Sequence, residues 1–393
     1  MKILVLASTY PRWRNDNEPG FVHELCRRLA FDAEVRVVCP HDKGAKDTED
    51  LDGVQVYRFR YAPEFLEKLV YNGGILGNLK KSWFKAFLLP FFFLAQWWAV
   101  RKQIRTWKPD VVHAHWIIPQ GLVAILSGCG KRGKVPLVLT SHGSDLNSLR
   151  GFLFLWIKRL VVSRASTLTV MSRAMLGHAA YVAQGKTPVV VRSMGVDLLE
   201  HFVPSQNRVS STQFFKMLFV GRLVENKGVD ILIKALPAIL KKIPSAQLEI
   251  VGFGPCQAAL ERLAEQLGVS RSILFEGAVP QIHLPDVYRG SHLFVAPFVN
   301  EGLGLVLVEA LGCGTPVVVS ELATCRDVYD GLGSVVTVPP SDPEGLARGV
   351  IEAFGRYEAL RHRALVERDL IVRRFDWSIV AAEYREILDK AAG

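Results

Sequence analysis

Residues 301–320, EGLGLVLVEALGCGTPVVVS, carry the most informative pattern of the chain. Gly302 and Gly304 open it, and glycines let a backbone come close to a ligand. An apolar helical run follows and ends at Gly312, after which residues 317–319 have the composition of a buried strand. The start of this helix would present free N–H groups and the positive end of the helix dipole, a combination that suits a phosphate.

Two carboxylates accompany this helix. Glu301 stands just before its start and Glu309 lies two turns inside it, so they are placed to hold hydroxyl groups on either side of a bound phosphate. Carboxylate pairs at this spacing also occur in ordinary helices, and the alternative is a strand–helix–strand packing element without a ligand. The glycines at both ends of the stretch favour a binding site.

A second phosphate-binding pattern occurs upstream, at residues 217–228, MLFVGRLVENKG. A predicted strand ends at Gly221, and Arg222 and Lys227 stand five positions apart before the next predicted helix. Two cations and a close backbone suit the charge of a diphosphate. The alternative is that both side chains are ordinary solvated surface cations.

These segments resemble the signatures of the retaining glycosyltransferases of family 4, the glycosyl transferases group 1. The first matches the family's Glu, seven residues, Glu signature, and the second its G-R-x-x-x-x-K-G element. The resemblance implies the GT-B fold, an α/β architecture in which two Rossmann-like domains face each other across a cleft. It also implies that Arg222 and Lys227 hold the donor's phosphates, while Glu301 contacts the donor sugar and Glu309 the ribose.

Further matches extend the resemblance along the chain. Residues 140–145 match T-x-H-x-x-D, residues 251–255 match V-G-x-G-P, and residues 273–279 resemble a strand whose end contacts the base. In the family a loop glycine between the first strand and the first helix meets the donor, and Gly20 is the candidate, with an ordinary turn as the alternative. The resemblance implies catalytic roles for His142, Glu301, Arg222 and Lys227. It implies donor contacts at Gly20, Asp145, Gly221, Gly252, Gly254, Ala278, Val279, Gly302, Leu303, Gly304, Leu305 and Glu309.

Residues 109–116, PDVVHAHW, predict a strand that runs into a site loop, and they resemble the PDVVHAH strand end of the same family. We expect His113 and His115 to face opposite sides of this strand, with His113 packed in the core. Residues 323–327, ATCRD, stand where the family has a Gly-Gly-x-Pro-Glu turn, which leaves the role of that turn open.

Residues 83–100, WFKAFLLPFFFLAQWWAV, are the most apolar stretch of the chain. Its length is near the minimum for a membrane span, but Lys85, Pro90 and Gln96 interrupt it. Tryptophans near its ends and flanking cations are typical of a helix lying in a membrane interface. The flanking cations are Lys80, Lys81, Arg101 and Lys102. The alternatives are a buried crossover helix of the first domain and a true span.

Composition limits the class of protein. The 393 residues are 49% hydrophobic and 22% charged, which is typical of a globular chain, and the net charge of +10 favours an anionic partner. Aromatic and apolar residues mixed with the cations favour a membrane surface, and we expect no nucleic-acid partner.

The start MKILVLASTY predicts a buried strand, not a signal peptide. Six unpaired-looking cysteines indicate a reducing compartment: Cys26, Cys39, Cys129, Cys256, Cys313 and Cys325.

The domain organisation follows from these motifs. We expect a Rossmann-like acceptor-binding domain at residues 1–200 and a Rossmann-like nucleotide-sugar-binding domain at 214–370, with the polar stretch 204–213 as the linker. By resemblance, residues 371–393 form a helix that crosses back to the first domain. The expected location is the cytoplasm, with peripheral contact to the inner face of the cell membrane.

The predicted activity is transfer of a sugar, with retention, from a nucleotide-sugar to a hydroxyl acceptor. No Asp-x-Asp clamp is evident, so we expect no cofactor and no obligatory metal. The resemblance suggests a glycan or lipid-linked acceptor in envelope polysaccharide synthesis. A nucleotide-sugar epimerase of GT-B architecture and a non-catalytic glycan-assembly subunit are the alternatives. Product analysis without acceptor distinguishes the first, and donor binding without transfer the second.

Overall fold

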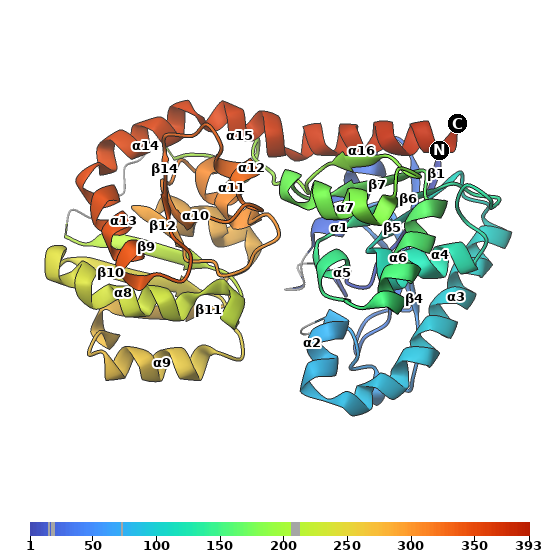
Figure 1. Cartoon of the computed structure of the whole chain (residues 1–393), viewed down its shortest axis with the longest axis horizontal. Coiled ribbons are helices and arrows are strands. Elements are labelled where there is room, and N and C mark those ends of the chain that lie inside the picture. The colour runs from blue at the N-terminus through green and yellow to red at the C-terminus, as the bar shows by residue number, and fades with distance from the viewer. Residues whose placement is uncertain (15, 17–19, 72–73, 206–212) are drawn as a thin grey trace. The chain divides into compact units, whose positions relative to one another are not determined.

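The computed structural model describes residues 1–14, 16, 20–71, 74–205 and 213–393 (Figure 1). The chain divides into two compact units, each an α/β unit with its own sheet. Unit 1 comprises Met1–Gly195 together with Trp377–Gly393, and unit 2 comprises Val196–Asp376. Two Rossmann-like units are the fold class that the sequence predicts.

Unit 1 is built on an eight-stranded sheet in the order β3-β4-β2-β1-β5-β6-β7-β8. Short apolar runs form its central strands, as expected for a parallel sheet covered on both faces. Its strands are β1 Lys2–Leu6, β2 Glu34–Pro40, β3 Thr48–Leu51, β4 Val54–Phe59, β5 Val111–His115, β6 Leu137–Ser141, β7 Thr167–Val170 and β8 Val189–Val191. All neighbouring pairs are parallel except the edge pair of β3 and β4.

Helices cover both faces of this sheet. They are α1 Phe21–Leu29, α2 Gly74–Lys81, α3 Leu89–Thr106, α4 Leu122–Leu126, α5 Ser144–Asn147, α6 Phe152–Arg164, α7 Leu176–Ala183 and α16 Trp377–Ala392. Right-handed crossovers place α1 on one face and α3, α4 and α6 on the other, because β1 leads to β2 in one direction while β4 leads to β5 in the opposite one. A 3-10 turn, Trp83–Leu88, leads into α3.

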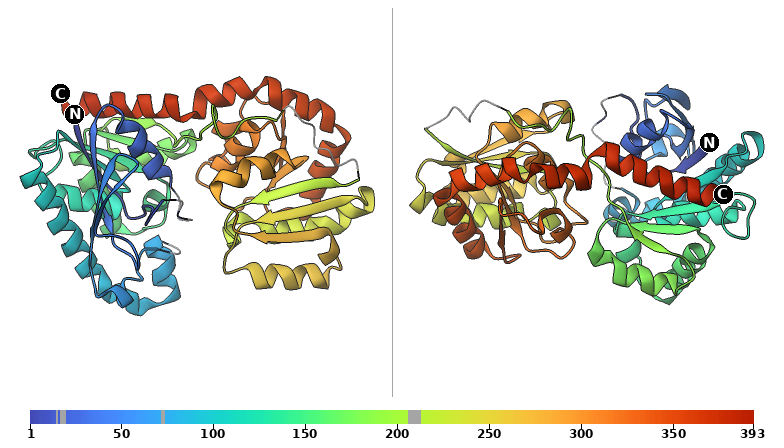
Figure 2. Two further views of the ribbon diagram at one scale, coloured as in Figure 1. Left: turned by 180° about the vertical axis from the view of Figure 1, so that it is seen from behind. Right: turned by 90° about the horizontal axis from the view of Figure 1, so that it is seen from above.

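The C-terminal helix α16 belongs to unit 1, as the sequence predicts. It packs against α1 and against strands β5 and β6 (Figures 1 and 2). Trp377, Tyr384 and Leu388 are buried there, and the Tyr384 hydroxyl donates a hydrogen bond to the Arg192 carbonyl at 3.1 Å. The last helix of the chain is therefore part of the core of the first unit.

Unit 2 has a six-stranded sheet in the order β11-β10-β9-β12-β13-β14, and all its strand pairs are parallel. The strands are β9 Phe215–Val220, β10 Ala246–Val251, β11 Ile273–Gly277, β12 Leu293–Ala296, β13 Val317–Ser320 and β14 Val335–Val338. The helices are α8 Val229–Lys242, α9 Gln257–Gln266, α10 Leu284–Arg289, α11 Leu305–Gly312, α12 Arg326–Tyr329, α13 Pro343–Gly355, α14 Tyr357–Val366 and α15 Arg368–Phe375. The predicted helix and strand of residues 301–320 are α11 and β13.

The chain passes between the units at Gly195–Val196 and again at Asp376–Trp377. The Val196 amide donates to the Phe375 carbonyl at 2.8 Å, and the Leu198 amide donates to the Asp376 carboxylate at 2.9 Å. These bonds tie the two crossing segments together within unit 2. The first crossing thus precedes the boundary at residue 200 and the linker 204–213 that the sequence suggests, and residues 206–212 of that linker lie outside the described residues.

Candidate active site

The phosphate-binding candidates of unit 2 all lie on loops at the carboxyl ends of its strands. Gly221, Arg222 and Lys227 follow β9, and the 301–305 loop follows β12. The candidates after β10 and β11 are Gly252, Gly254, Ala278 and Val279. In open parallel sheets this edge is where ligands bind. The topology therefore brings the separate sequence motifs of unit 2 to one edge.

Glycine is required where two of these loops cross. A β-carbon at Gly252 would lie 1.9 Å from the carbonyl oxygen of Gly221, a distance no side chain tolerates. The Gly221 amide donates to the Val251 carbonyl at 2.9 Å, and the Gly252 amide to the Gly277 carbonyl at 2.7 Å. The backbones after β9, β10 and β11 are thereby held close together at the sheet edge.

Glu301 is held in place from three sides. Its carboxylate contacts the Lys227 ammonium through Oε2, and its Oε1 accepts a hydrogen bond from the Gly302 amide at 2.8 Å. The Thr324 hydroxyl donates to the Glu301 carbonyl at 2.6 Å. Thr324 belongs to the turn that departs from the family pattern, so that turn supports the motif here. Glu301 and Lys227, which the sequence predicts to belong to one site, are thus in direct contact.

The two cations differ in their surroundings. Lys227 is half-buried, with its ammonium 4.9 Å from the centre of the Phe298 ring. Arg222 is exposed, and its guanidinium forms no ion pair with any residue in the described part of the chain. Arg222 therefore retains its full hydrogen-bonding capacity toward a phosphate.

Helix α11 begins where the sequence places it. Gly304 precedes the helix with φ of +84°, a left-handed conformation that favours glycine. No side chain in the described part of the chain caps the helix start, so the first amides of α11 remain oriented toward the 302–304 loop. The positive end of the helix dipole points the same way, and this geometry suits an anion.

Glu309 is more deeply buried than Glu301. Its side chain is buried, and its Oε2 accepts a hydrogen bond from the Tyr288 hydroxyl at 2.8 Å. Burial raises the pKa of Glu309 to about 7, although the hydrogen bond from Tyr288 works in the opposite direction. Tyr288 stands on α10 and carries no sequence signal that links it to Glu309. The carboxylate is positioned by a partner that the sequence analysis missed.

The candidates of unit 1 centre on His142, which follows β6. Its ring lies among Phe21, His115 and Trp116, with ring centres 4.9, 5.2 and 4.7 Å away, respectively. Its Nε2 is 3.0 Å from Nδ1 of His115. Burial lowers the pKa of His142 to about 3, so the ring is neutral at physiological pH. A neutral ring in this place can donate or accept a hydrogen bond but carries no charge.

The prediction that His113 and His115 face opposite sides of the strand is wrong. Both are fully buried, and their ring centres lie 4.3 Å apart on one face of β5. Side chains alternate with a period of two, so residues i and i+2 share a face. His113 does pack in the core, with Nε2 2.7 Å from the Thr140 hydroxyl, whereas His115 contacts His142.

Asp145 is buried, and both its carboxylate oxygens are occupied by protein groups. Oδ2 accepts a hydrogen bond from the Ile117 amide at 2.6 Å, and Oδ1 accepts one from the Ser141 hydroxyl at 2.8 Å. Burial raises the pKa of Asp145, opposed by these hydrogen bonds. These contacts favour a role in holding the loops on either side of His142, and direct donor contact by Asp145 stays a prediction.

Gly20 precedes α1 with φ of −84°, and a β-carbon there would meet no atom within 4 Å. Among the described residues of unit 1, nothing therefore obstructs a β-carbon at this position. A need for glycine at position 20 would have to come from a ligand. The suggested donor contact at Gly20 stays a prediction.

Helix α3 turns a row of apolar side chains outward. Phe92, Gln96 and Val100 are buried toward the sheet. Trp83, Phe84 and Phe87 of the preceding 3-10 turn and Phe91, Leu94 and Trp98 of α3, each at least 59% exposed, together form the exposed row of α3. Among the described residues, the helical stretch Trp83–Thr106 alone is long and apolar enough to cross a membrane, and 17% of its most apolar window is buried. A crossover helix that is buried on all sides, one of the alternatives for residues 83–100, is therefore wrong, because the outer face of α3 is exposed.

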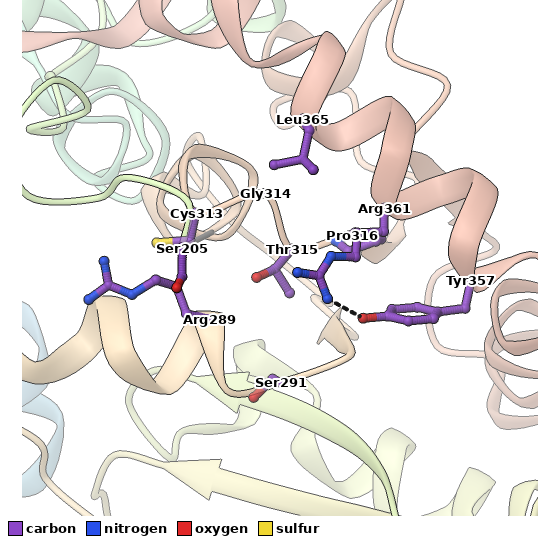
Figure 3. A pocket seen from close by; sticks show the side chains of 10 residues that line it. All are labelled: Ser205, Arg289, Ser291, Cys313, Gly314, Thr315, Pro316, Tyr357, Arg361 and Leu365. Carbon is purple, nitrogen blue, oxygen red and sulfur yellow. Dashed lines mark hydrogen bonds between the residues drawn. The ribbon is translucent and has the colours of Figure 1, made fainter. Parts of the chain in front are cut away.

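Two cavities lie away from the glycine loops. A groove of about 680 Å³ separates α3 from β4 in unit 1, and Phe91, Leu94 and Trp98 line its helical wall. Figure 3 shows a cavity of about 10 Å³ in unit 2, room for one water molecule at most. It is lined by Ser205, Arg289, Ser291, Cys313, Gly314, Thr315, Pro316, Tyr357, Arg361 and Leu365. It lies at the amino ends of β12 and β13, opposite the phosphate-binding candidates, and cannot hold a nucleotide.

Metal ligands do not gather in the described part of the chain: it contains no group of three or more His, Cys, Asp or Glu side chains that could hold an ion. Phosphate binding by Arg222, Lys227 and the start of α11 stays a prediction.

Two families match the chain, one in each unit. Residues 215–355 match the glycosyl transferases group 1, and residues 21–195 match the glycosyl transferase 4-like domain. The phosphatidyl-myo-inositol mannosyltransferase of Mycobacterium tuberculosis is 30% identical over 310 residues, which cover 75% of this chain and 78% of that protein. The glycogen synthase of the same organism is 29% identical over 292 residues, covering 72% and 69%.

Solved structures show the same fold. The sucrose-phosphate synthase of Thermosynechococcus elongatus superposes with a TM-score of 0.78 at 19% sequence identity, covering 99% of this chain and 98% of that one. At this identity the likeness concerns the fold alone, and it establishes the GT-B architecture. With both units matched and a relative 30% identical over three quarters of its length, the protein belongs to the glycosyl transferases group 1 and is a retaining, family 4 glycosyltransferase that uses a nucleotide-sugar donor.

Proposed function

We propose that this glycosyltransferase elongates a lipid-linked or polysaccharide intermediate of cell-envelope glycan synthesis. The observation that carries the donor half of the proposal is the contact of Lys227 with Glu301, with an unpaired Arg222 on the same sheet edge in the described part of the chain. Arg222, Lys227 and the start of α11 bind the diphosphate, Glu301 orients the sugar, and Glu309 holds the ribose. The remaining donor contacts are those of Gly221, Gly252, Gly254, Ala278, Val279 and residues 302–305.

The reaction proceeds by front-face departure. The bond between the anomeric carbon and the phosphate oxygen breaks as the acceptor oxygen forms its bond from the same face, and the departing phosphate oxygen takes the acceptor's proton. Arg222 and Lys227 stabilise the charge that develops on the diphosphate. His142, neutral and fixed by His115, donates or accepts a hydrogen bond at the sugar. No charged His142 takes part.

Donor binding tests the site directly. Thermal shift with a panel of UDP- and GDP-sugars should identify a stabilising donor for the wild-type protein, since a ligand that binds the folded state raises its stability. Arg222→Ala should lose the shift. Arg271→Ala is the matched control, because Arg271 is an exposed arginine before β11, at the amino end of the sheet. Equal donor shifts in both variants would refute the phosphate assignment, and epimerised donor without acceptor would indicate an epimerase.

We propose further that the enzyme works at the cytoplasmic face of the membrane, with α3 in contact with the lipids. The exposed apolar row of α3 supports this, as does the relative whose name includes phosphatidyl-myo-inositol. Charge reversal of the flanking cations should abolish binding to anionic vesicles, because each contributes about 1 kcal/mol near such a surface. The reversed residues are Lys80, Lys81, Arg101 and Lys102.

The control for this experiment reverses four exposed cations of unit 2, so that the net charge changes equally. These are Lys234, Lys241, Lys242 and Arg262. Loss of vesicle binding in both variants would show a dependence on net charge alone and would contradict a specific contact of α3. Retained binding in both would remove the membrane proposal.

A further inference from the structure

The first turn of α6 exposes apolar side chains without an intervening polar one. The helix begins with Phe152-Leu153-Phe154-Leu155-Trp156, and Phe152 is 86%, Leu153 62% and Trp156 55% exposed. The buried face of α6 lies further along the helix. Exposed aromatic and aliphatic residues grouped in this way mark a contact surface in a folded protein.

This turn is firmly attached to the body of unit 1. The ammonium of Lys158 is buried and donates hydrogen bonds to the carbonyls of Leu146 and Leu149, both at 2.7 Å. Lys158 thereby joins α6 to the segment that follows the His142 loop. The helix that carries the exposed side chains is thus anchored to unit 1 two residues after Trp156.

Helices α6 and α3 are linked through a shared neighbour, α4. Helix α4 packs against both α3 and α6 (Figure 1). The Trp97 indole donates to the Leu126 carbonyl of α4 at 3.2 Å, and the Leu126 side chain is 59% exposed. Apolar side chains are therefore exposed on α3, α4 and α6, which lie on one face of the unit 1 sheet.

The charge of the segment that carries these helices favours one class of partner. Residues 68–196 hold 18 Lys and Arg against two acidic residues, Asp110 and Asp145, and Asp145 is buried. Of the 48 basic and 38 acidic residues of the chain, 30 basic and 36 acidic ones remain elsewhere. The segment that carries the exposed apolar side chains thus carries all of the positive excess. An anionic lipid surface complements both features.

We propose that the first turn of α6 is a second membrane-inserting element, which together with α3 docks unit 1 on an anionic phospholipid bilayer. The inference rests on the proposed membrane contact of α3 and adds a second point of attachment. One helix in the interface leaves the protein free to rotate about the axis of that helix. A second element removes this freedom and sets the distance of the His142 loop from the lipid surface.

Site-specific fluorescence tests the proposal. The full-length protein receives a single environment-sensitive NBD label at Phe152→Cys, with Cys256→Ser removing the one cysteine of the six that is not buried. Phe87→Cys on the α3 side is the companion site. Phe31→Cys is the matched control, because Phe31 is 85% exposed but stands on the turn after α1, on the other face of the sheet.

With vesicles of phosphatidylglycerol and phosphatidylcholine, labels at positions 152 and 87 should shift to the blue and be quenched by doxyl lipids, while the label at 31 should not respond. Response at 87 without response at 152 would overturn this inference and leave the proposed contact of α3 intact. Absence of response at both would refute both. Equal response at 31 would show non-specific adsorption and would overturn the inference.

Unlabelled variants provide a second measurement. Phe152→Asp combined with Leu153→Asp should weaken partitioning into anionic vesicles by about tenfold or more, because each inserted apolar side chain loses its transfer from water into the bilayer. Phe31→Asp should partition like the wild type. Both variants change exposed positions, and thermal unfolding checks that each remains folded. Unchanged partitioning of the double variant would contradict the proposal.

Discussion

Among single residues, the contact between Lys227 and Glu301 orders the proposed donor site. The carboxylate holds the ammonium at the sheet edge before any ligand arrives, and the Gly302 amide and Thr324 hydroxyl hold the Glu301 segment. A preorganised charge costs no reorganisation during the reaction. The exposed Arg222 provides the second cation.

Lys227→Ala should lower kcat/KM by on the order of 10²–10³, since removal of one preorganised charge-stabilising group has this effect in comparable sites. Lys234→Ala is the control, because Lys234 is an exposed lysine that pairs with Asp230 on α8. Steady-state kinetics with a verified donor provide the measurement. Wild-type turnover of the Lys227 variant would remove this lysine from the site.

Glu309 makes the stability of the protein depend on pH. Its folded pKa, about 7, is higher than the ordinary value of 4.5, so the folded state binds its proton more tightly than the unfolded state does. The stabilisation is complete below about pH 4.5 and is lost as pH rises through 7. Glu309→Gln should therefore become more stable than the wild type over this interval, by at most about 3 kcal/mol above pH 7.

Denaturant unfolding of both proteins at several pH values measures this difference. The amide oxygen introduced by Glu309→Gln would still accept the hydrogen bond from Tyr288, so the comparison isolates the charge. A stability difference that stays constant from pH 4.5 to 8 would show that Glu309 is already ionised at acid pH in the folded protein.

At the scale of elements, the loops after the strands of unit 2 are held by backbone contacts that leave no room for side chains. Gly252→Ala should destabilise the protein by ~1–3 kcal/mol, because its β-carbon collides with the Gly221 carbonyl. Gly20→Ala should leave stability unchanged, since that position has open space around it. Thermal unfolding of both variants provides the measurement.

Activity measurements test whether a ligand contacts the backbone of Gly20. If a ligand approaches this backbone, Gly20→Ala should raise the donor or acceptor KM while its thermal unfolding matches that of the wild type. Full activity of a stable Gly20→Ala variant would identify position 20 as an ordinary turn. A loss of stability in Gly20→Ala would contradict the open space around the residue.

At the scale of the whole molecule, unit 1 is completed by the end of the chain. Truncation after Asp376 removes α16 and with it the buried Trp377, Tyr384 and Leu388. Each buried aromatic or aliphatic side chain of this kind contributes several kcal/mol, so unit 1 should unfold at a much lower temperature. Unit 2, which ends at Asp376, should keep its own transition.

Calorimetry of the full chain and the truncated chain measures both transitions. Truncation after Lys390 is the control, because the last three residues contribute no buried side chain. Loss of both transitions in the protein truncated after Asp376 would show that the stability of unit 2 depends on unit 1.

The local elements and their order can be read from the sequence. Glycines, prolines and apolar runs specify short-range conformation, so the helix α11 and the strand β13 lie where residues 301–320 predict them. The two predicted phosphate-binding motifs, after β9 and after β12, are each contained in one short segment and could therefore be recognised from the sequence. The rule that i and i+2 share a face would have placed His113 and His115 correctly as well.

Contacts between side chains that are distant in sequence depend on how the chain packs. Tyr288 holds Glu309, Thr324 holds Glu301, and Phe21 covers His142, and each pair is distant in sequence and carries no mutual signal. The apolar stretches of α3 and α6 could have been core or surface. Burial depends on what the rest of the chain covers, a property of packing that no local pattern contains.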